Sequence, residues 1–276
     1  MRVRKAINNN VVSCEDENGR ELVVMGRGLG FRVKTGDTID PSGVEKIFRM
    51  DTPEQTHRLE ELFTQLPAEL LELCNRIIET AKDALGRRLN ESIYLTLTDH
   101  IQFALNRVKQ GMDFPNPLVS EVRMFYPTEY GLGRYALEEI RKGMGVALPE
   151  DEAASIALHL VNAEYDTSMN ATMRSAQVLQ PMIRILENWP GLTRKADPLD
   201  SDELIIQIKL MAMQAFSQVR QDWAGQELVE LVKDKFPEAF SCAGAMVRCL
   251  EEYCGHAIPA ADQAFLAICI QKTYLL

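Results

Sequence analysis

The chain has 276 residues, of which 46% are hydrophobic and 25% charged, and its formal net charge at pH 7 is −10. This length is more than one small core needs, so we expect two or three domains. No apolar run approaches the ~18 residues of a membrane span, and no signal peptide precedes the first polar residues. We therefore expect a cytoplasmic protein without membrane insertion. The six cysteines form no C-x-x-C pair, which argues against a zinc knuckle and predicts free thiols.

The charge is unevenly distributed along the chain. Residues 1–56 hold nine Lys/Arg and nine Asp/Glu, so the remainder carries the whole −10. Only the first module could favour nucleic acid, and even that module is neutral. If it binds nucleic acid, the placement of its charges must matter more than their sum.

Residues 1–50 are predicted to form the short strands of a small all-β module. Their first apolar run is interrupted by three successive Asn, and a turn is expected at Asn18-Gly19. Gly26, Gly28 and Gly30 break the next β-branched run. Glycine at this density predicts bulges or a close approach of the backbone to another group.

From Thr52 onward the apolar residues follow helical spacing to the C-terminus, and Gly86 is expected to end one of the helices. We place a connector near 50–66 and a second boundary near 166–172. Breaks in the helical pattern are expected near 111–117, 126–133, 143–149, 188–200, 236–244 and 255–259.

An internal repeat relates two halves of the helical part. A shift of 110 residues aligns LPEDEAASIALHLVN with IPAADQAFLAICIQK and places Cys269 at the position of His159. A shift of 107 residues aligns LTDHIQF with LIIQIKL and places Gln207 at the position of His100. The halves are predicted to be copies of one helical domain, with the two histidines in the first copy.

His100 and His159 are the sharpest candidates for chemistry. Each is expected in the middle of a helix among apolar residues, where a lone histidine is most often a satisfied core residue. Two histidines in one domain could instead bind a metal, act as a general base or accept a phosphoryl group. No third metal ligand and no G-x-S-x-G motif is visible, which disfavours a metal site and a serine hydrolase. Asp99 is a candidate supporting residue, although sequence neighbours do not share a helix face.

In the first module the segments AINNNVV and MGRGLGF stand out. The Asn run could read nucleic-acid bases through bidentate hydrogen bonds or form a turn. Arg27 lies between two glycines and could present its guanidinium with little crowding, and Phe31 could stack on a base or fill the core. A tight hairpin in a small barrel explains the same pattern without a ligand.

Together the segments INNNVVS, ELVVMGRGLGF, LTDHI and LPEDEAASIALHLVNAE, in this order, resemble the BglG/SacY-type transcriptional antiterminators over essentially the full chain. The resemblance implies a multidomain protein: a small all-β RNA-binding module (1–56) followed by two all-α regulatory domains of the phosphotransferase-system type (66–170 and 171–276). It also implies a homodimer that binds a leader-mRNA hairpin and prevents formation of a terminator. No cofactor and no enzymatic activity are expected. By match to the family's motifs, the implied RNA-contacting residues are Lys5, Asn8, Asn10, Gly26, Arg27 and Phe31.

The resemblance further implies that His100 and His159 are phosphorylated by a sugar-specific permease when its sugar is absent. The second regulatory domain departs from the family pattern, because Gln207 and Cys269 stand where further phosphorylatable histidines are usual. We therefore expect this domain to be degenerate and mainly structural, and its phosphorylation by the general phosphocarrier protein is in doubt. Two other classes remain open: a phosphorylation-dependent interaction protein without RNA binding and, far below it, a two-histidine metalloenzyme.

Overall fold

The computed structural model describes residues 1–276 except 51, 113–114, 195–197, 218–224 and 276. The chain divides into two compact units. The first contains Met1–Asn116 and Thr128–Asp166, and the second contains Pro117–Pro127 and Thr167–Leu276. Among the residues described, none of the helices combines the length and apolarity that a bilayer crossing requires.

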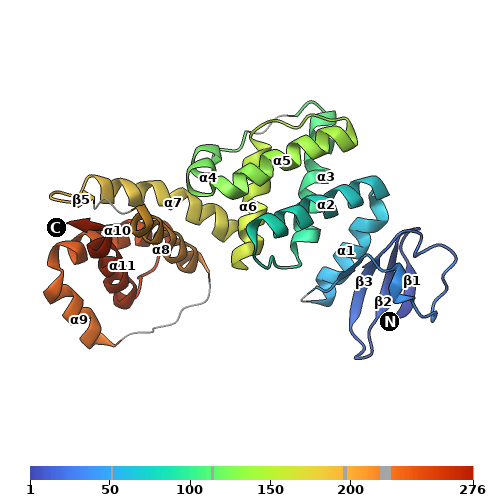
Figure 1. The fold of residues 1–276 in the computed structure, drawn as a ribbon, viewed down its shortest axis with the longest axis horizontal. Coiled ribbons are helices and arrows are strands. Elements are labelled where there is room, and N and C mark those ends of the chain that lie inside the picture. The colour runs from blue at the N-terminus through green and yellow to red at the C-terminus, as the bar shows by residue number, and fades with distance from the viewer. Residues whose placement is uncertain (51, 113–114, 195–197, 218–224, 276) are drawn as a thin grey trace. The chain divides into compact units, whose positions relative to one another are not determined.

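The first unit begins with an antiparallel sheet whose four strands are neighbours in chain order (Figure 1). The strands are β1 (Arg2–Ala6), β2 (Val11–Glu15), β3 (Glu21–Met25) and β4 (Lys46–Phe48). The predicted turn between β2 and β3 is confirmed, with Gly19 at φ 75°. Both faces of the sheet are buried: Val12 and Val24 pack with Ile39 on one face, and Val23 and Phe48 face the helices on the other. The all-β module predicted for residues 1–50 is thus confirmed.

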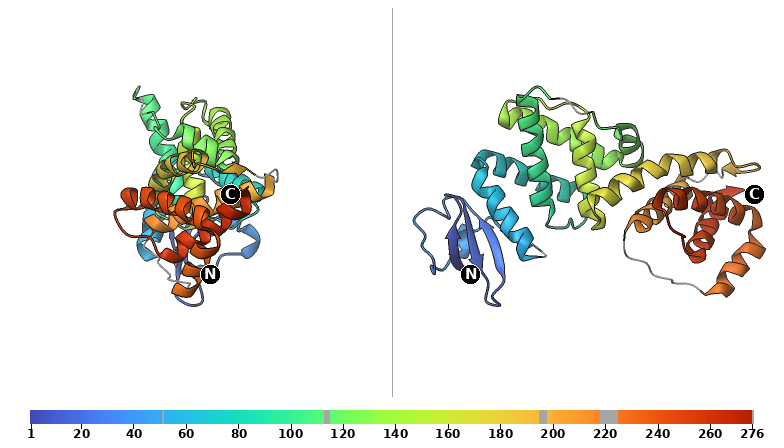
Figure 2. Two further views of the ribbon diagram at one scale, coloured as in Figure 1. Left: turned by 90° about the vertical axis from the view of Figure 1, so that its left-hand side faces the viewer. Right: turned by 180° about the vertical axis from the view of Figure 1, so that it is seen from behind.

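The described helices of the first unit are α1 (Pro53–Gln65), α2 (Ala68–Leu85), α3 (Ile93–Lys109), α5 (Pro127–Met144) and α6 (Glu152–Tyr165). Helix α1 begins where the Thr52 hydroxyl accepts a hydrogen bond from the Gln55 amide, with Pro53 in the first helical position. It runs beside the sheet in Figure 1 and in the right-hand view of Figure 2, and its Leu59 and Phe63 join the sheet's core. Helix α2 ends at Gly86 in the left-handed conformation, as predicted.

The described helices of the second unit are α4 (Val119–Phe125), α7 (Met169–Glu187), α8 (Pro198–Phe216), α9 (Gln226–Lys235), α10 (Pro237–Cys254) and α11 (Ala260–Thr273). A two-residue pair joins β5 (Thr193–Arg194) to β6 (Tyr274–Leu275). In chain order, α2 to α6 correspond to α7 to α11. His100 and Gln207 lie on the second helix of each series, and His159 and Cys269 lie on the fifth.

Two predicted helix breaks are present but much shorter than expected, at Tyr126 and at Phe236. The break expected at 126–133 contains the whole first turn of α5, which begins at Pro127, and the break expected at 236–244 contains the start of α10 at Pro237. Proline is well tolerated in the first turn of a helix, where its missing N–H has no intrahelical partner. Gly133 lies inside α5 for a packing reason: a Cβ there would sit 2.1 Å from the Ala153 carbonyl oxygen of α6.

We predict that Gly133→Ala lowers the free energy of unfolding by about 1–3 kcal/mol, because α5 and α6 must separate to admit the methyl group. Gly131→Ala is the matched control, since a Cβ at Gly131 meets nothing within 4 Å. That control should raise stability by about 0.5–1 kcal/mol, as alanine is the better helix former. Urea denaturation of both variants measures the difference; equal stabilities would contradict the close approach.

Candidate RNA interface and histidine site

The Asn run forms a tight turn between β1 and β2. The Asn8 side-chain oxygen accepts hydrogen bonds from the amides of Asn10 and Val11, both at 2.9 Å, and its Nδ2 donates to the Phe63 carbonyl oxygen at 3.1 Å. The Asn10 side-chain oxygen accepts from the Gly28 amide at 2.9 Å. Both side chains therefore shape the loops, and Asn8 also ties the turn to the end of α1.

The glycine-rich segment after β3 lies against this turn, as its glycine density predicted. A Cβ on Gly26 would lie 2.0 Å from the Gly43 carbonyl oxygen, and one on Gly30 would lie 1.9 Å from the Asn8 carbonyl oxygen. The segment presents Arg27 and Phe31 outward: Arg27 is exposed, and Phe31 is 59% exposed. The geometry thus brings Asn8, Asn10, Gly26 and Arg27 together, with Phe31 on the same loop. Lys5 is exposed on the neighbouring strand β1.

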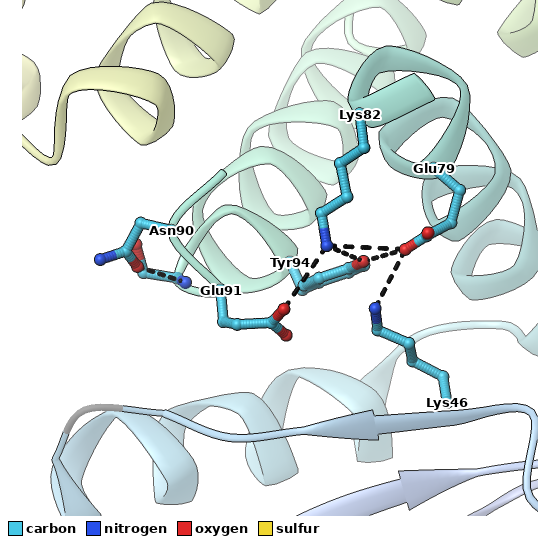
Figure 3. Close-up of polar contacts among 7 residues, drawn as sticks. Lys46, Glu79, Lys82, Asn90, Glu91 and Tyr94 are labelled. Carbon is cyan, nitrogen blue, oxygen red and sulfur yellow. Dashed lines mark hydrogen bonds and ion pairs between the residues drawn. The ribbon is translucent and has the colours of Figure 1, made fainter. Parts of the chain in front are cut away.

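A charged cluster connects the sheet to the helices of the first unit (Figure 3). Lys46 of β4 donates to Glu79 of α2 at 3.0 Å, and Lys82 of α2 donates to the Tyr94 hydroxyl of α3 at 2.8 Å. The Tyr94 hydroxyl also donates to Glu79. Burial alone would raise the pKa of Glu79, but the hydrogen bonds from Tyr94 and Lys46 and the two lysine charges outweigh it and lower the pKa. The carboxylate stays ionised and holds both lysines at the edge of the shared core.

The two candidate histidines meet in the first unit. His100 of α3 and His159 of α6 have ring centroids 4.8 Å apart, with an angle of 40° between the planes. His100 Nε2 lies 2.9 Å from Glu152 Oε2, and Arg107 donates to the other oxygen of the same carboxylate. Asp99 is exposed. Sequence reasoning missed Glu152, although the acidic run after Pro149 at the start of a predicted helix was a signal that a carboxylate could point inward.

The electrostatics of this site favour a neutral His159. Burial, and then the nearby His100, lower the pKa of His159 from 6.5 to about 3, and its Nδ1 is enclosed without a hydrogen-bond partner in the described part of the chain. Burial alone would raise the pKa of Glu152, but its hydrogen bond with His100 and the charges of His100 and Arg107 hold that pKa below the ordinary 4.5. Within the described residues, no group of three His, Cys, Asp or Glu side chains that could hold a metal ion is found. A histidine paired with a carboxylate can act as a nucleophile or carry a proton.

The equivalent positions of the second unit lack this chemistry. Gln207 lies partly buried on α8, and Cys269 is buried on α11. Burial, together with the negative charge of Glu203, raises the pKa of the Cys269 thiol to about 11. The thiol is therefore protonated at neutral pH, and a protonated thiol is a poor nucleophile.

Two known domain families match separate parts of the chain. Residues 1–57 match the CAT RNA binding domain, and residues 75–163 match the PRD domain. The chain is 35% identical over 272 residues to the transcription antiterminator LicT of Bacillus subtilis (strain 168), covering 99% of this chain and 98% of LicT. The chain belongs to the BglG/SacY-type family of transcriptional antiterminators.

Two further members of this family support the assignment. The β-glucoside operon antiterminator of Dickeya chrysanthemi is 37% identical over 272 residues, covering 99% of this chain and 96% of its own. The crystal structure of GlcT CAT-PRDI superposes with a TM-score of 0.54 at 34% identity, covering 59% of this chain and 97% of that chain. The predicted fold class, a small β module followed by a helical chain, is thereby confirmed.

We predict that His159 makes stability depend on pH. Its pKa is lower in the folded chain than the ordinary 6.5, so the unfolded chain binds the proton more readily as the pH falls. The free energy of unfolding should therefore decline as the pH drops below 6.5 toward 3. In His159→Gln this decline should be shallower between about pH 7 and pH 5, because the titrating group is gone. Urea denaturation across this range tests it.

The matched control is His57→Gln, since the His57 side chain is 72% exposed on α1. This variant should keep the pH dependence of the original chain. A His159→Gln variant with the same slope as the control would show that His159 is not responsible.

Proposed function

We propose that this protein is a sugar-responsive transcriptional antiterminator. As a homodimer it binds a leader-mRNA hairpin through residues 1–56 and prevents formation of an overlapping terminator. The proposal makes the protein a regulator rather than an enzyme, acting in the cytoplasm on nascent mRNA. The observation that carries it is the full-length similarity to named antiterminators. The residues matched to the family's RNA-binding motif support it, because the β1–β2 turn and the loop after β3 contact each other and β1 lies beside them.

The geometry of the β module supports RNA contact by a small set of groups. The exposed Arg27 offers a planar fork of donors, and the exposed Phe31 offers a ring on which an unpaired base can stack. Lys5 adds a positive charge on the adjacent strand. Gly26, Asn8 and Asn10 act by shaping the loop, since their groups pack against backbone. Because the module's net charge is zero, specificity comes from these placed groups.

The regulatory part of the proposal places phosphorylation on His100 and His159 of the first regulatory domain (66–170). The donor is a sugar-specific permease of the phosphotransferase system. A phosphoryl group adds a charge of about −1.5 to −2. Both histidines are partly buried, so this charge is costly to desolvate among the helices on which the sheet packs, and it should disturb them and weaken the dimer. In the second domain (171–276), Gln207 and the protonated Cys269 accept no phosphoryl group from the general phosphocarrier protein, which leaves that domain a structural role.

Arg27→Ala is expected to weaken binding of an antiterminator leader hairpin by about 1–3 kcal/mol, because it removes a donor to the RNA. Arg20→Ala is the matched control: Arg20 is exposed at the β2–β3 turn, away from the loop, and its loss should change affinity little. Gel shifts at several salt concentrations measure both. If the unmodified chain bound no hairpin even at low salt, the interaction-protein alternative would be favoured.

The phosphorylation account predicts that His100→Asp, which mimics added charge, reduces both dimerisation and hairpin binding. His57→Asp places the same charge on an exposed side chain and should leave both unchanged. Sedimentation and gel shifts read out the two properties separately. A His100→Asp protein that remained fully dimeric and fully active would refute negative control through this histidine.

A further inference from the structure

The carboxylate of Glu152 is held by two side chains of α3. Its Oε2 lies 2.9 Å from His100 Nε2, and its Oε1 accepts a hydrogen bond from Arg107. Glu152 occupies the first position of α6 and is only 3% exposed. Arg107 lies on α3, two turns beyond His100, so one helix supplies both partners of the carboxylate. Glu152 therefore has a fixed place and a fixed orientation relative to the His100 ring.

This arrangement determines where the proton of a neutral His100 lies. An ionised carboxylate is only an acceptor, and a neutral imidazole carries one N–H and one lone pair. With Nε2 as the donor to Glu152, the lone pair must be on Nδ1. The hydrogen bond from His100, and then the charge of Arg107, lower the pKa of Glu152 and keep it ionised despite its burial. The nucleophilic nitrogen of His100 is thus selected by a residue on another helix.

We propose that Glu152 is a positioning residue for phosphorylation of His100, and that it makes Nδ1 the nitrogen that accepts the phosphoryl group. The inference rests on the proposed function of His100 as a phosphoryl acceptor. The Nδ1 lone pair attacks phosphorus, the Nδ1–P bond forms, and the bond between phosphorus and the donor atom breaks. The electron pair of that bond leaves with the donor, while the proton stays on Nε2.

Glu152 also stabilises the positive charge that this step creates on the His100 ring. A ring that keeps its Nε2 proton while bonding phosphorus through Nδ1 becomes positively charged. The Glu152 carboxylate at 2.9 Å offsets that charge as it develops. His159, whose ring lies 4.8 Å away, is neutral and so adds no opposing positive charge. Aspartate or glutamate paired with histidine serves the same two purposes, tautomer choice and charge stabilisation, in hydrolases.

Replacing Glu152 with Gln should invert the tautomer. Arg107 donates only, so it will hold the carbonyl oxygen of the introduced amide and turn the amide NH₂ toward His100. That NH₂ donates to Nε2, which moves the ring proton to Nδ1. Long-range ¹H–¹⁵N spectra of the full chain, which has four histidines, distinguish the two forms. We expect Nε2–H in the original chain and Nδ1–H in Glu152→Gln; an Nδ1–H tautomer in the original chain would overturn the proposal.

The functional readout uses phosphoramidate as the phosphoryl donor, with ammonia as the leaving group. ³¹P and ¹⁵N spectra should show the Nδ1 isomer on His100 of the original chain. In Glu152→Gln the rate of forming that isomer should fall by at least about tenfold. Glu150→Gln is the matched control, because the Glu150 side chain is 77% exposed two residues away, and it should keep the original rate and isomer. An Nε2 isomer in the original chain, or an unchanged rate and isomer in Glu152→Gln, would overturn the proposal.

These outcomes are separable from failure of the proposed function. If hairpin binding were absent, the antiterminator proposal would fall, while the tautomer and isomer assignments would still hold. If the tautomers were as expected but His100 of the original chain took no phosphoryl group, both the regulatory proposal and the role of Glu152 in phosphorylation would be overturned. A folded Glu152→Gln protein, checked by its thermal unfolding, keeps the comparison valid.

Discussion

The packing of Phe48 is the contact on which the first unit depends. Phe48 ends β4, is 1% exposed, and meets Phe63 of α1 and Tyr94 of α3 edge to face, with centroid distances of 5.3 and 4.9 Å. Such aromatic pairs add about 0.5–1.5 kcal/mol each beyond the area they bury. Because Tyr94 and His100 lie on the same helix, the sheet with the RNA-contact candidates shares a core with the helix that carries the candidate phosphoryl acceptor.

The loop that carries the RNA-contact candidates owes its shape to backbone packing rather than to side-chain bulk. Gly26 and Gly30 lie so close to neighbouring carbonyl oxygens that a Cβ on either would clash with them. Asn8 accepts hydrogen bonds from two amides of its own turn, against which Gly30 packs. Rigid loops lose less entropy on binding than flexible ones. Arg27 and Phe31 are thus presented from a constrained backbone, which suits recognition of a defined RNA shape.

The two helical series differ in the residues that form the histidine site. The offsets that pair His100 with Gln207 and His159 with Cys269 also pair Glu152 with Asp262 and Arg107 with Gln214. The second copy therefore retains one carboxylate and lacks both histidines and the arginine. The two copies nevertheless share apolar packing positions: Ala154 and Ala157 of the first correspond to Ala264 and Ala267 of the second, and all four are buried.

The sequence by itself determined the β module, the helical remainder, the repeat and the family, because strand and helix periodicity and motif order are local properties of the chain. It placed the starts of α5 and α10 too late, since both helices begin at a proline, which interrupts a helical pattern but is tolerated in the first turn. Only the tertiary structure decided that Glu152 is the partner of His100 and that Asn8 holds the end of α1. The partners in these two contacts are 52 and 55 positions apart in the chain, and no local pattern specifies which side chains will meet once the helices and the sheet share a core.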